Sequence, residues 1–233
     1  MEIRQLFDPK SSTYSYLVWD RESLEAALID PVQDQINRDI KLVKQLGLGL
    51  KYTLETHVHT DHITGSGYLR QIFNSIVLVH ENSQTKCADV LIKGGDFIPL
   101  GSNRIDVLYT PGHTDSGISY LISGAVFTGD ALLIGGCGRT DLQSGDPGTL
   151  YDSITQQLFT LPGDTAVYPG HDYQGRTSST IAEEKVSNPR IGNNKSRDEF
   201  VLIMSDLHYN PPLRMHEAFP SNLRCGTQGI ETH

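Results

Sequence analysis

Short runs of apolar and β-branched residues alternate with helical patterns along this chain. Strands are predicted at residues 3–7, 13–20 and 25–31, where turn-like segments interrupt the apolar runs. Apolar positions recur at helical spacing over residues 33–45, and Gly47 follows as a helix-ending residue. Further helices are predicted at 66–73, 148–159, about 178–186 (stopped by Asn188-Pro189) and about 197–208, followed by a Pro-rich tail.

Four strand-like runs end in a turn that carries a residue able to bind a metal. YTLETH ends at His57, IDVLYTPGH at His113, AVFTGD at Asp130 and AVYPGH at His171. In sheets with helical connections, ligands bind outside the carboxyl ends of the strands. The pattern therefore predicts that these four side chains converge on one site.

The first of these turns is part of the run THVHTDH, which contains His57, His59, Asp61 and His62. So many polar groups in one short stretch are costly to bury unless a cation holds them together, which favours metal binding over a solvated loop. The chain has nine histidines in all. Four of the others have no neighbouring candidate ligand and are assigned no functional role: His80, His208, His216 and His233.

Length and composition are those of an ordinary globular protein. With 233 residues, 37% hydrophobic and 20% charged, we expect a single catalytic domain over 1–233, with 195–233 as a short helix and tail packed on it. The net charge of −9 disfavours nucleic acid as a partner. No apolar run is long enough to span a bilayer and the N-terminus does not resemble a signal peptide, so we expect a cytoplasmic protein with no membrane partner.

The three cysteines, Cys87, Cys137 and Cys225, are an odd number at wide spacing. This spacing argues against a disulfide framework and against a thiolate zinc site. It fits a reducing compartment. Cys137 has no identifiable partner base, so we do not expect it to be a nucleophile.

The motifs HVHTDH, GHTDSG (112–117), FTGD (127–130) and YPGHDY (168–173) resemble those of the metallo-β-lactamase superfamily. This resemblance implies an α+β fold, a four-layer αββα sandwich. It also implies two adjacent metal positions, the first held by His57, His59 and His113, the second by Asp61, His62 and His171, with Asp130 as the bridge. Since this fold serves hydrolases, nucleases and oxidoreductases alike, it does not decide the reaction.

Four longer segments resemble the persulfide dioxygenase family, also called sulfur dioxygenases: HITGSGYLR (62–70), GCGRTDLQSGDPGTLYDSI (136–154), PGHDYQGRTSSTIAEEKVSNPRI (169–191) and FPSNLRCG (219–226). The resemblance implies oxidation of glutathione persulfide with O2 to sulfite and glutathione. It further implies one non-haem Fe(II) per chain, held by His57, His113 and Asp130. Two imidazoles and one carboxylate leave three positions of an octahedral ion open for substrate and O2.

Two interpretations remain open for the other four candidate ligands, which are His59, Asp61, His62 and His171. They either orient the iron ligands through hydrogen bonds or hold a second metal as in hydrolases. The resemblance also implies that Arg139 grips a carboxylate of the substrate and that Tyr173 acts beside its sulfur. A surface ion pair for Arg139 and a packing role for Tyr173 are the alternatives.

Two other functions remain in view. A glyoxalase II-like hydrolase would cleave hydroxyacylglutathione thioesters with two metals. Such chains typically carry a longer helical C-terminal portion, whereas fewer than fifty residues follow Asn188-Pro189 here. A non-catalytic metal-binding protein is the second alternative, disfavoured because structural metal sites are normally closed. The family resemblance also allows a homodimer and a separate rhodanese-type sulfurtransferase as partners.

Overall fold

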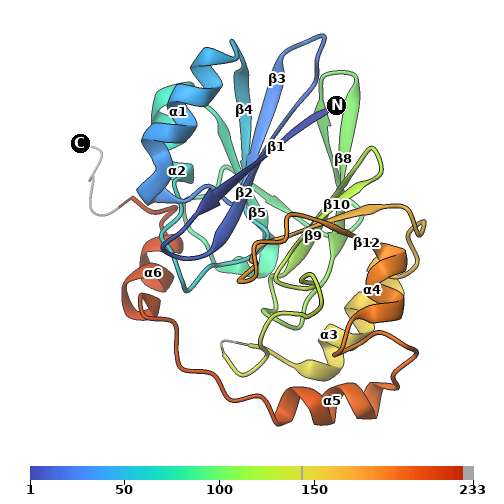
Figure 1. Cartoon of the computed structure of the whole chain (residues 1–233). Helices are drawn as coiled ribbons and strands as arrows, with labels where there is room; N and C mark the ends of the chain where they lie inside the picture. Colours follow the sequence, from blue (N-terminus) through green and yellow to red (C-terminus); the bar gives the residue numbers. More distant parts are fainter. Residues whose placement is uncertain (143, 228–233) are drawn as a thin grey trace. The chain divides into compact units, whose positions relative to one another are not determined.

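The computed structural model describes residues 1–142 and 144–227, which form two compact units (Figure 1). Unit 1 contains residues 1–92, 99–104 and 211–227. Unit 2 contains residues 93–98 and 105–210. Each unit has its own sheet, helices and hydrophobic core.

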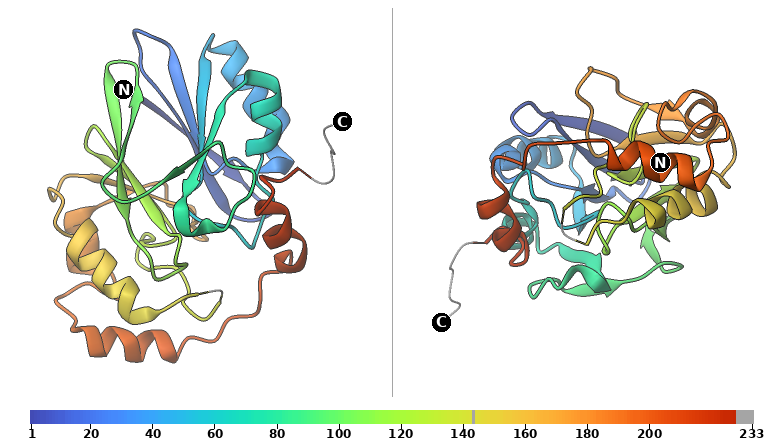
Figure 2. Two further views of the ribbon diagram at one scale, coloured as in Figure 1. Left: turned by 180° about the vertical axis from the view of Figure 1, so that it is seen from behind. Right: turned by 90° about the horizontal axis from the view of Figure 1, so that it is seen from below.

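The sheet of unit 1 has six strands in chain order. They are β1 (Glu2–Asp8), β2 (Thr13–Trp19), β3 (Glu25–Ile29), β4 (Gly49–Leu54), β5 (Ile76–His80) and β6 (Val90–Ile92). The first three pair antiparallel as a meander, and β3 to β6 run parallel. Parallel neighbours need crossover connections, which α1 (Ile36–Gln45) and α2 (Ser66–Phe73) supply. These two helices lie side by side along the strands (Figure 2).

Helix α1 is amphipathic, and this determines how unit 1 is packed. Its apolar side brings Ile36, Ile40 and Val43 against the sheet. There they meet Leu17 and Leu28, both fully buried. The helix begins after a 3₁₀ turn at Gln33–Gln35, so the helical pattern over 33–45 is confirmed with a short irregular start.

The second sheet has the strand order β12-β11-β10-β9-β8-β7. Its strands are β7 (Phe97–Leu100), β8 (Asn103–Tyr109), β9 (Ile118–Ile122), β10 (Ala125–Gly129), β11 (Ala166–Pro169) and β12 (Ser179–Thr180). Strands β8, β9 and β10 are successively antiparallel, whereas β10 and β11 are parallel. The carboxyl ends of β8, β10 and β11 therefore lie at one edge of the sheet.

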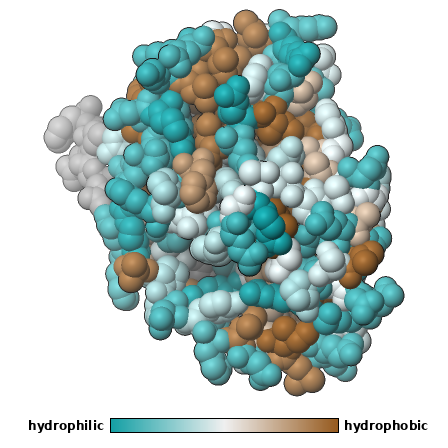
Figure 3. Space-filling model, in the orientation of Figure 1, coloured by the Kyte–Doolittle hydropathy of each residue, from teal (hydrophilic) through white to brown (hydrophobic). Residues whose placement is uncertain are grey.

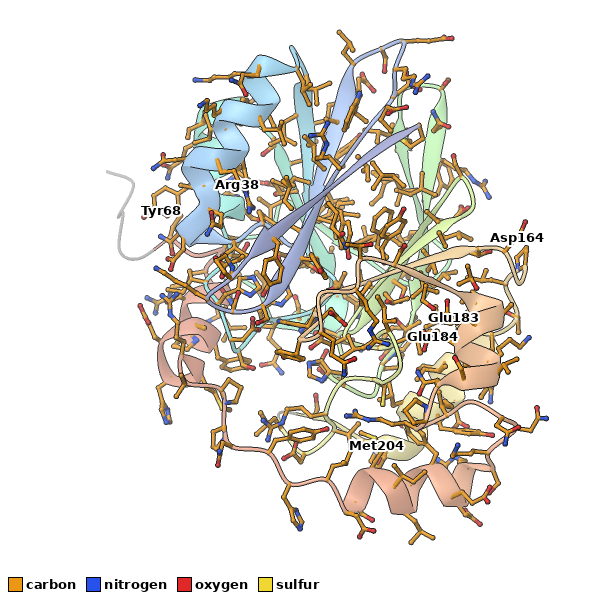
Figure 4. All side chains as sticks on the ribbon, in the orientation of Figure 1. Arg38, Tyr68, Asp164, Glu183, Glu184 and Met204 are labelled. Atoms are coloured by element: carbon orange, nitrogen blue, oxygen red, sulfur yellow. A yellow bond between two sulfur atoms is a disulfide. The ribbon has the colours of Figure 1, made fainter. Side chains whose placement is uncertain are left out.

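Three helices belong to unit 2: α3 (Pro147–Ser153), α4 (Ile181–Ser187) and α5 (Arg197–Ser205). Helix α3 packs against α5, with the rings of Tyr151 and Phe200 5.7 Å apart. Figure 4 shows Met204 on the side of α5 that faces α3, where it joins the buried core. This core also contains Leu150 and Ile154.

Several boundaries differ from those predicted. The helix expected over 148–159 changes after Ser153 into a π-helical turn, Ile154–Leu158. The helix expected near 178–186 begins only at Ile181, because Thr180 caps it through its hydroxyl. The tail contains an additional helix, α6 (Met215–Asn222), which the sequence pattern did not reveal because Pro220 lies inside it.

The expectation that no disulfide forms was wrong. Cys87 and Cys225 are joined, although 138 residues separate them in the chain, and Cys137 is a buried free cysteine. Wide sequence spacing says nothing about distance in the fold, which is why the argument failed. The cysteine pattern therefore no longer supports a reducing compartment.

The face of the molecule shown in Figure 3 is mainly polar. Hydrophobic residues form only smaller patches among hydrophilic ones on this face. Within the described ranges, no helix combines the length and the apolar character needed to cross a lipid bilayer.

Candidate metal-binding residues

The run THVHTDH forms a buried loop at the carboxyl end of β4 in unit 1. His57, His59 and His62 are all buried, and Asp61 is partly exposed. The three imidazoles lie close together with tilted ring planes; the ring centroids are 4.1 Å apart for His57 and His59 and 4.3 Å apart for His59 and His62. The predicted clustering of this loop is therefore confirmed.

His57 is oriented by a hydrogen-bonded chain that starts at Asp30. This carboxylate accepts hydrogen bonds from the backbone N–H of Thr56 (2.7 Å) and from its hydroxyl (2.8 Å). Since the hydroxyl proton of Thr56 points to Asp30, the oxygen can accept from His57 Nδ1, 3.0 Å away. The proton is then on Nδ1, and Nε2 is the nitrogen with the lone pair for a metal.

His59 lies between two buried carboxylates. Its Nε2 is 3.1 Å from Asp30 Oδ1 and 3.5 Å from Glu55 Oε2. Burial opposes the charged imidazolium, but the facing Asp30 and Glu55 outweigh this effect and raise the pKa of His59 well above its usual value. Glu55 also accepts hydrogen bonds from the hydroxyls of Thr64 and Ser66, each 2.5 Å long.

Asp61 and His62 form a second pair in the same loop. His62 Nδ1 lies 2.8 Å from Asp61 Oδ2, and the hydroxyl of Thr13 on β2 donates to the same oxygen over 3.1 Å. Together with His59, these two residues have ligand atoms close enough to hold one ion. The loop thus offers a possible second metal position, but each of its members already has a protein partner.

In unit 2, the three predicted strand-end residues come together. His113 follows β8, Asp130 follows β10 and His171 follows β11. His113 Nε2 lies 3.6 Å from Asp130 Oδ2, and His171 Nδ1 lies 2.7 Å from Asp130 Oδ1. The prediction that parallel strand ends bring these side chains together is confirmed within this unit.

The protonation of His113 follows from its other neighbour. Its Nδ1 donates to the backbone carbonyl of Arg139 over 2.6 Å, so its Nε2 keeps the lone pair. This nitrogen is the one that faces Asp130. Unit 2 therefore provides one imidazole and one carboxylate oxygen as neighbouring ligand atoms.

Two glycines allow the backbone to pack closely around Asp130. A Cβ at Gly170 would lie 2.7 Å from Asp130 Oδ1, and one at Gly138 would lie 2.3 Å from the Asp130 carbonyl oxygen. Both contacts are shorter than real side chains tolerate. A larger residue would press on the carboxylate at Gly170 and on the Asp130 backbone at Gly138.

Arg139 has intramolecular partners for its guanidinium. Its Nε and one terminal nitrogen donate to the two oxygens of Asp141 over 2.6 and 2.7 Å, and its other terminal nitrogen donates to the Asn210 carbonyl over 2.8 Å. The group also lies over the ring of Tyr209. The ion pair weighed as an alternative role is thus present, and the Arg139 carbonyl has the additional role of orienting His113.

Tyr173 lies on the surface with 75% of its area exposed, so a role in core packing is wrong. Its ring is nearly parallel to that of His171, with centroids 6.1 Å apart. Cys137, by contrast, is buried, and this burial raises the pKa of its thiol to about 11. A protonated buried thiol agrees with the expectation that Cys137 is not a nucleophile.

Among the described residues, the histidines without an assigned role belong to no group of candidate ligands. The Nδ1 of His80 accepts from the backbone N–H of Asn82, and His208 and His216 are exposed. His233 lies outside the described residues.

The sequence interpretation missed two buried carboxylates of unit 1. Asp30 follows β3 and Glu55 follows β4, so both obey the strand-end pattern that identified the other candidates. The same criterion applied to the segments ALID and YTLE would have found them. Asn222, which also contacts the loop, had no such signal.

Comparison with known proteins identifies the family. A family model described as "Metallo-beta-lactamase superfamily" matches residues 8–171. The protein "Persulfide dioxygenase ETHE1, mitochondrial" of Bos taurus is 47% identical over 97% of this chain and 89% of its own length. A hydroxyacylglutathione hydrolase of Brucella ovis is 36% identical over 93% of this chain and 88% of its own.

A solved structure supports the same assignment. The crystal structure of ETHE1 from Myxococcus xanthus is 51% identical, with a TM-score of 0.95, and the match covers 97% of this chain and all of that one. The predicted fold class, an α+β fold of the metallo-β-lactamase type, is therefore confirmed.

Proposed function

This chain belongs to the metallo-β-lactamase superfamily and, within it, to the persulfide dioxygenase family, and we propose that it oxidises glutathione persulfide with O2 to sulfite and glutathione at one Fe(II) ion. The observation that carries this proposal is the similarity to persulfide dioxygenases over nearly the whole chain. The hydroxyacylglutathione hydrolase relative supports a glutathione-derived substrate.

We propose His57, His113 and Asp130 as the iron ligands. The hydrogen bonds of the protein fit this role, because both imidazoles have Nδ1 engaged by a neighbour and Nε2 left as the donor atom. Asp130 shares Oδ1 with His171 and turns Oδ2 toward His113. The resulting set of two nitrogens and one oxygen is typical of non-haem Fe(II) oxygenases.

When bound, Fe(II) supplies the redox chemistry that lets a persulfide react with O2. The chain itself supplies the geometry. Thr56 and the Arg139 carbonyl hold the two imidazoles in a fixed tautomer, and His171 holds the carboxylate. A fixed ligand set keeps the same positions open for both reactants, which makes their reaction effectively intramolecular.

A single metal is supported by the partners of the remaining histidines. His59 faces Asp30 and Glu55, His62 faces Asp61, and His171 faces Asp130. Each contact gives the imidazole a carboxylate partner within the protein, so each of these histidines has a role that does not require a second metal. We therefore propose that His59, Asp61, His62 and His171 orient the ligands and do not hold a second ion.

For the substrate, we propose that Arg139 binds a glutathione carboxylate and that Tyr173 acts beside the sulfur. Asp141 already occupies the guanidinium of Arg139, but nearly half of the Asp141 side chain is exposed. A substrate carboxylate could replace it there with the same two-pronged geometry. The high exposure of Tyr173 next to His171 leaves its ring accessible to a ligand.

The deciding experiment compares two reactions in the same preparation. Protein purified anaerobically is analysed for metal, then assayed for O2 uptake with glutathione persulfide and for thiol release from lactoylglutathione. One iron per chain with O2 uptake supports the proposal. Two zinc ions with thioester cleavage would replace it with the hydrolase function, and bound iron without either reaction would indicate a non-catalytic metal protein.

Single variants test the ligand assignment. His113→Ala and Asp130→Ala should each lose iron and O2 uptake, because each removes one of only three protein bonds to the metal. An Asp130→Ala protein with its full iron content would show that the assigned ligands are wrong.

We further propose a cytoplasmic location, to which the Cys87–Cys225 disulfide adds no support. Cell fractionation tests this. A homodimer and a separate rhodanese-type sulfurtransferase that supplies the persulfide also belong to the proposal. Sedimentation analysis and co-purification test these two partners.

A further inference from the structure

A single carboxamide at the end of α6 makes three hydrogen bonds to the metal-binding loop of unit 1. The Nδ2 group of Asn222 donates to the carbonyls of His59 (2.9 Å) and His62 (2.8 Å). Its Oδ1 accepts from the backbone N–H of Thr64 over 2.9 Å. The Asn222 side chain thus uses both N–H groups and its oxygen on one loop that lies about 160 residues earlier in the chain.

These bonds replace the secondary structure that the loop lacks. Residues 55–64 follow β4 but belong to no helix or strand, so their buried carbonyls need other partners. The carboxamide of Asn222 is itself buried. Only a carboxamide offers two donors and an acceptor in so short a side chain, and Asp would offer acceptors alone.

The backbone after Asn222 also approaches the loop closely. The N–H of Gly67, at the start of α2, donates to the Cys225 carbonyl over 3.0 Å. A Cβ at Gly226 would lie 2.0 Å from the Thr64 carbonyl oxygen. The segment 222–226 therefore fits against the loop with no space for a larger side chain at Gly226.

The Cys87–Cys225 disulfide fixes this segment to the rest of unit 1. Cys225 lies three residues after Asn222, and Cys87 lies between β5 and β6. Cys225 packs with Val77 and Val79 of β5. A hydrogen bond joins the same two segments: the N–H of Lys86 donates to the Leu223 carbonyl over 3.1 Å. With the disulfide formed, Asn222 cannot move far from the loop.

We infer that Asn222 is a positioning residue for the metal-binding loop and that the Cys87–Cys225 disulfide holds Asn222 in place, so that reduction of this bond weakens metal binding. The inference rests on the proposed metal site. In the reduction, a dithiol gives two electrons and two protons to the disulfide, which becomes two thiols while the dithiol becomes a disulfide.

The first test uses Co(II), which has visible absorption bands that depend on its ligands, as a probe added to metal-free protein. Asn222→Asp keeps an acceptor for Thr64 but turns a carboxylate toward the carbonyls of His59 and His62. We expect its Kd for Co(II) to rise roughly tenfold or more, with an altered spectrum. Ser221→Ala, one residue earlier in the same helix, is the matched control and should bind like the wild type.

The second test needs no substitution in α6. Wild-type protein is compared before and after mild reduction with dithiothreitol, which is removed anaerobically before Co(II) is added because it binds Co(II) itself. Cys87→Ser serves as a permanently open form. Reduction should weaken Co(II) binding severalfold and speed hydrogen exchange of the amides in 57–67 of the metal-free protein. Exchange in β9 and β10 of unit 2 should not change. This comparison decides the question even if Asn222→Asp does not fold.

The outcomes distinguish failure of the proposed metal site from failure of the roles inferred for Asn222 and the disulfide. Wild-type protein that binds no metal would contradict the proposed function itself. If wild-type protein binds Co(II) and Asn222→Asp binds it equally well, with an unchanged spectrum but a lower Tm, Asn222 is only structural and the inference fails. Equal Co(II) affinity of the oxidised and reduced protein would overturn the role of the disulfide.

Discussion

His171 donates from Nδ1 to Oδ1 of Asp130 across 2.7 Å, and the two residues follow the adjacent parallel strands β11 and β10. This bond fixes the carboxylate so that Oδ2 faces His113. It also gives His171 a role that does not require a second metal.

His171→Ala should therefore weaken metal binding without abolishing it. Loss of a hydrogen-bond partner of a metal ligand typically costs about 10- to 100-fold in affinity. Anaerobic titration with Fe(II) or Co(II) would measure this change, and saturating metal should restore the bound ion. If His171→Ala bound no metal at saturation, as expected for His113→Ala, His171 would have to be a ligand itself.

Gly170→Ala should disturb the same carboxylate from its other side. The added methyl group would lie 2.7 Å from Asp130 Oδ1 and 3.0 Å from the Gly129 carbonyl carbon, so the backbone or the carboxylate must shift. We expect a loss of about 1–3 kcal/mol in the free energy of unfolding, together with weaker metal binding. Gly49→Ala is the matched control, because its added methyl group would lie 3.9 Å from the nearest atom, the Leu24 carbonyl oxygen. Similar losses for both variants would contradict this explanation.

The proposed exchange of Asp141 for a substrate carboxylate predicts opposite effects of two substitutions. Arg139→Ala should raise KM for glutathione persulfide because it removes the cation. Asp141→Asn should lower KM, since a neutral amide competes less well for the guanidinium. Steady-state O2 uptake gives both values, and iron content must be measured in parallel because the Arg139 carbonyl orients His113. An unchanged KM in both variants would show that Arg139 does not bind the substrate.

Asp39 on α1 is expected to lower the stability of the native protein as pH rises, so its replacement should stabilise the protein. Burial raises the pKa of this carboxyl, although Arg38 beside it acts in the opposite direction. A raised pKa means that the native state holds the proton more strongly than the unfolded chain does. The carboxyl therefore costs stability as pH rises from about 4 through its native pKa.

Asp39→Asn removes this cost. We expect it to stabilise the protein at pH 7 by on the order of 1 kcal/mol, with little difference near pH 4. Urea unfolding at several pH values would measure the effect. Equal stabilisation at every pH would argue against titration of Asp39 as the cause.

The cysteines predict a definite count of reactive thiols. In native oxidised protein, Cys87 and Cys225 are bonded to each other and Cys137 is buried with a pKa of about 11. Iodoacetamide at pH 8 should therefore label none of the three. Unfolding without reductant should expose one thiol, and reduction should expose the other two. Labelling of Cys87 in native protein, detected by mass spectrometry, would contradict the disulfide.

Local sequence patterns were sufficient to identify most of the candidate ligands. His113, Asp130 and His171 each follow an apolar run in a tight turn, and parallel strands bring their ends to one edge of a sheet. The helix at 66–73 was also predictable, and the one predicted at about 197–208 is present but ends at Ser205. Pro220 concealed α6, because a proline inside a helix is locally unfavourable and is tolerated here in its tertiary setting.

The sequence by itself determined which residue types stand at the strand ends, because strand periodicity and turn chemistry act over a few neighbouring residues. Only the tertiary structure decided the partners of these residues: Asp30 and Glu55 on either side of His59, Asp141 at Arg139, Asn222 on the loop and Cys87 bonded to Cys225. Most of these contacts join positions far apart in the chain. Their geometry depends on how whole elements pack, and no spacing rule within the sequence encodes it.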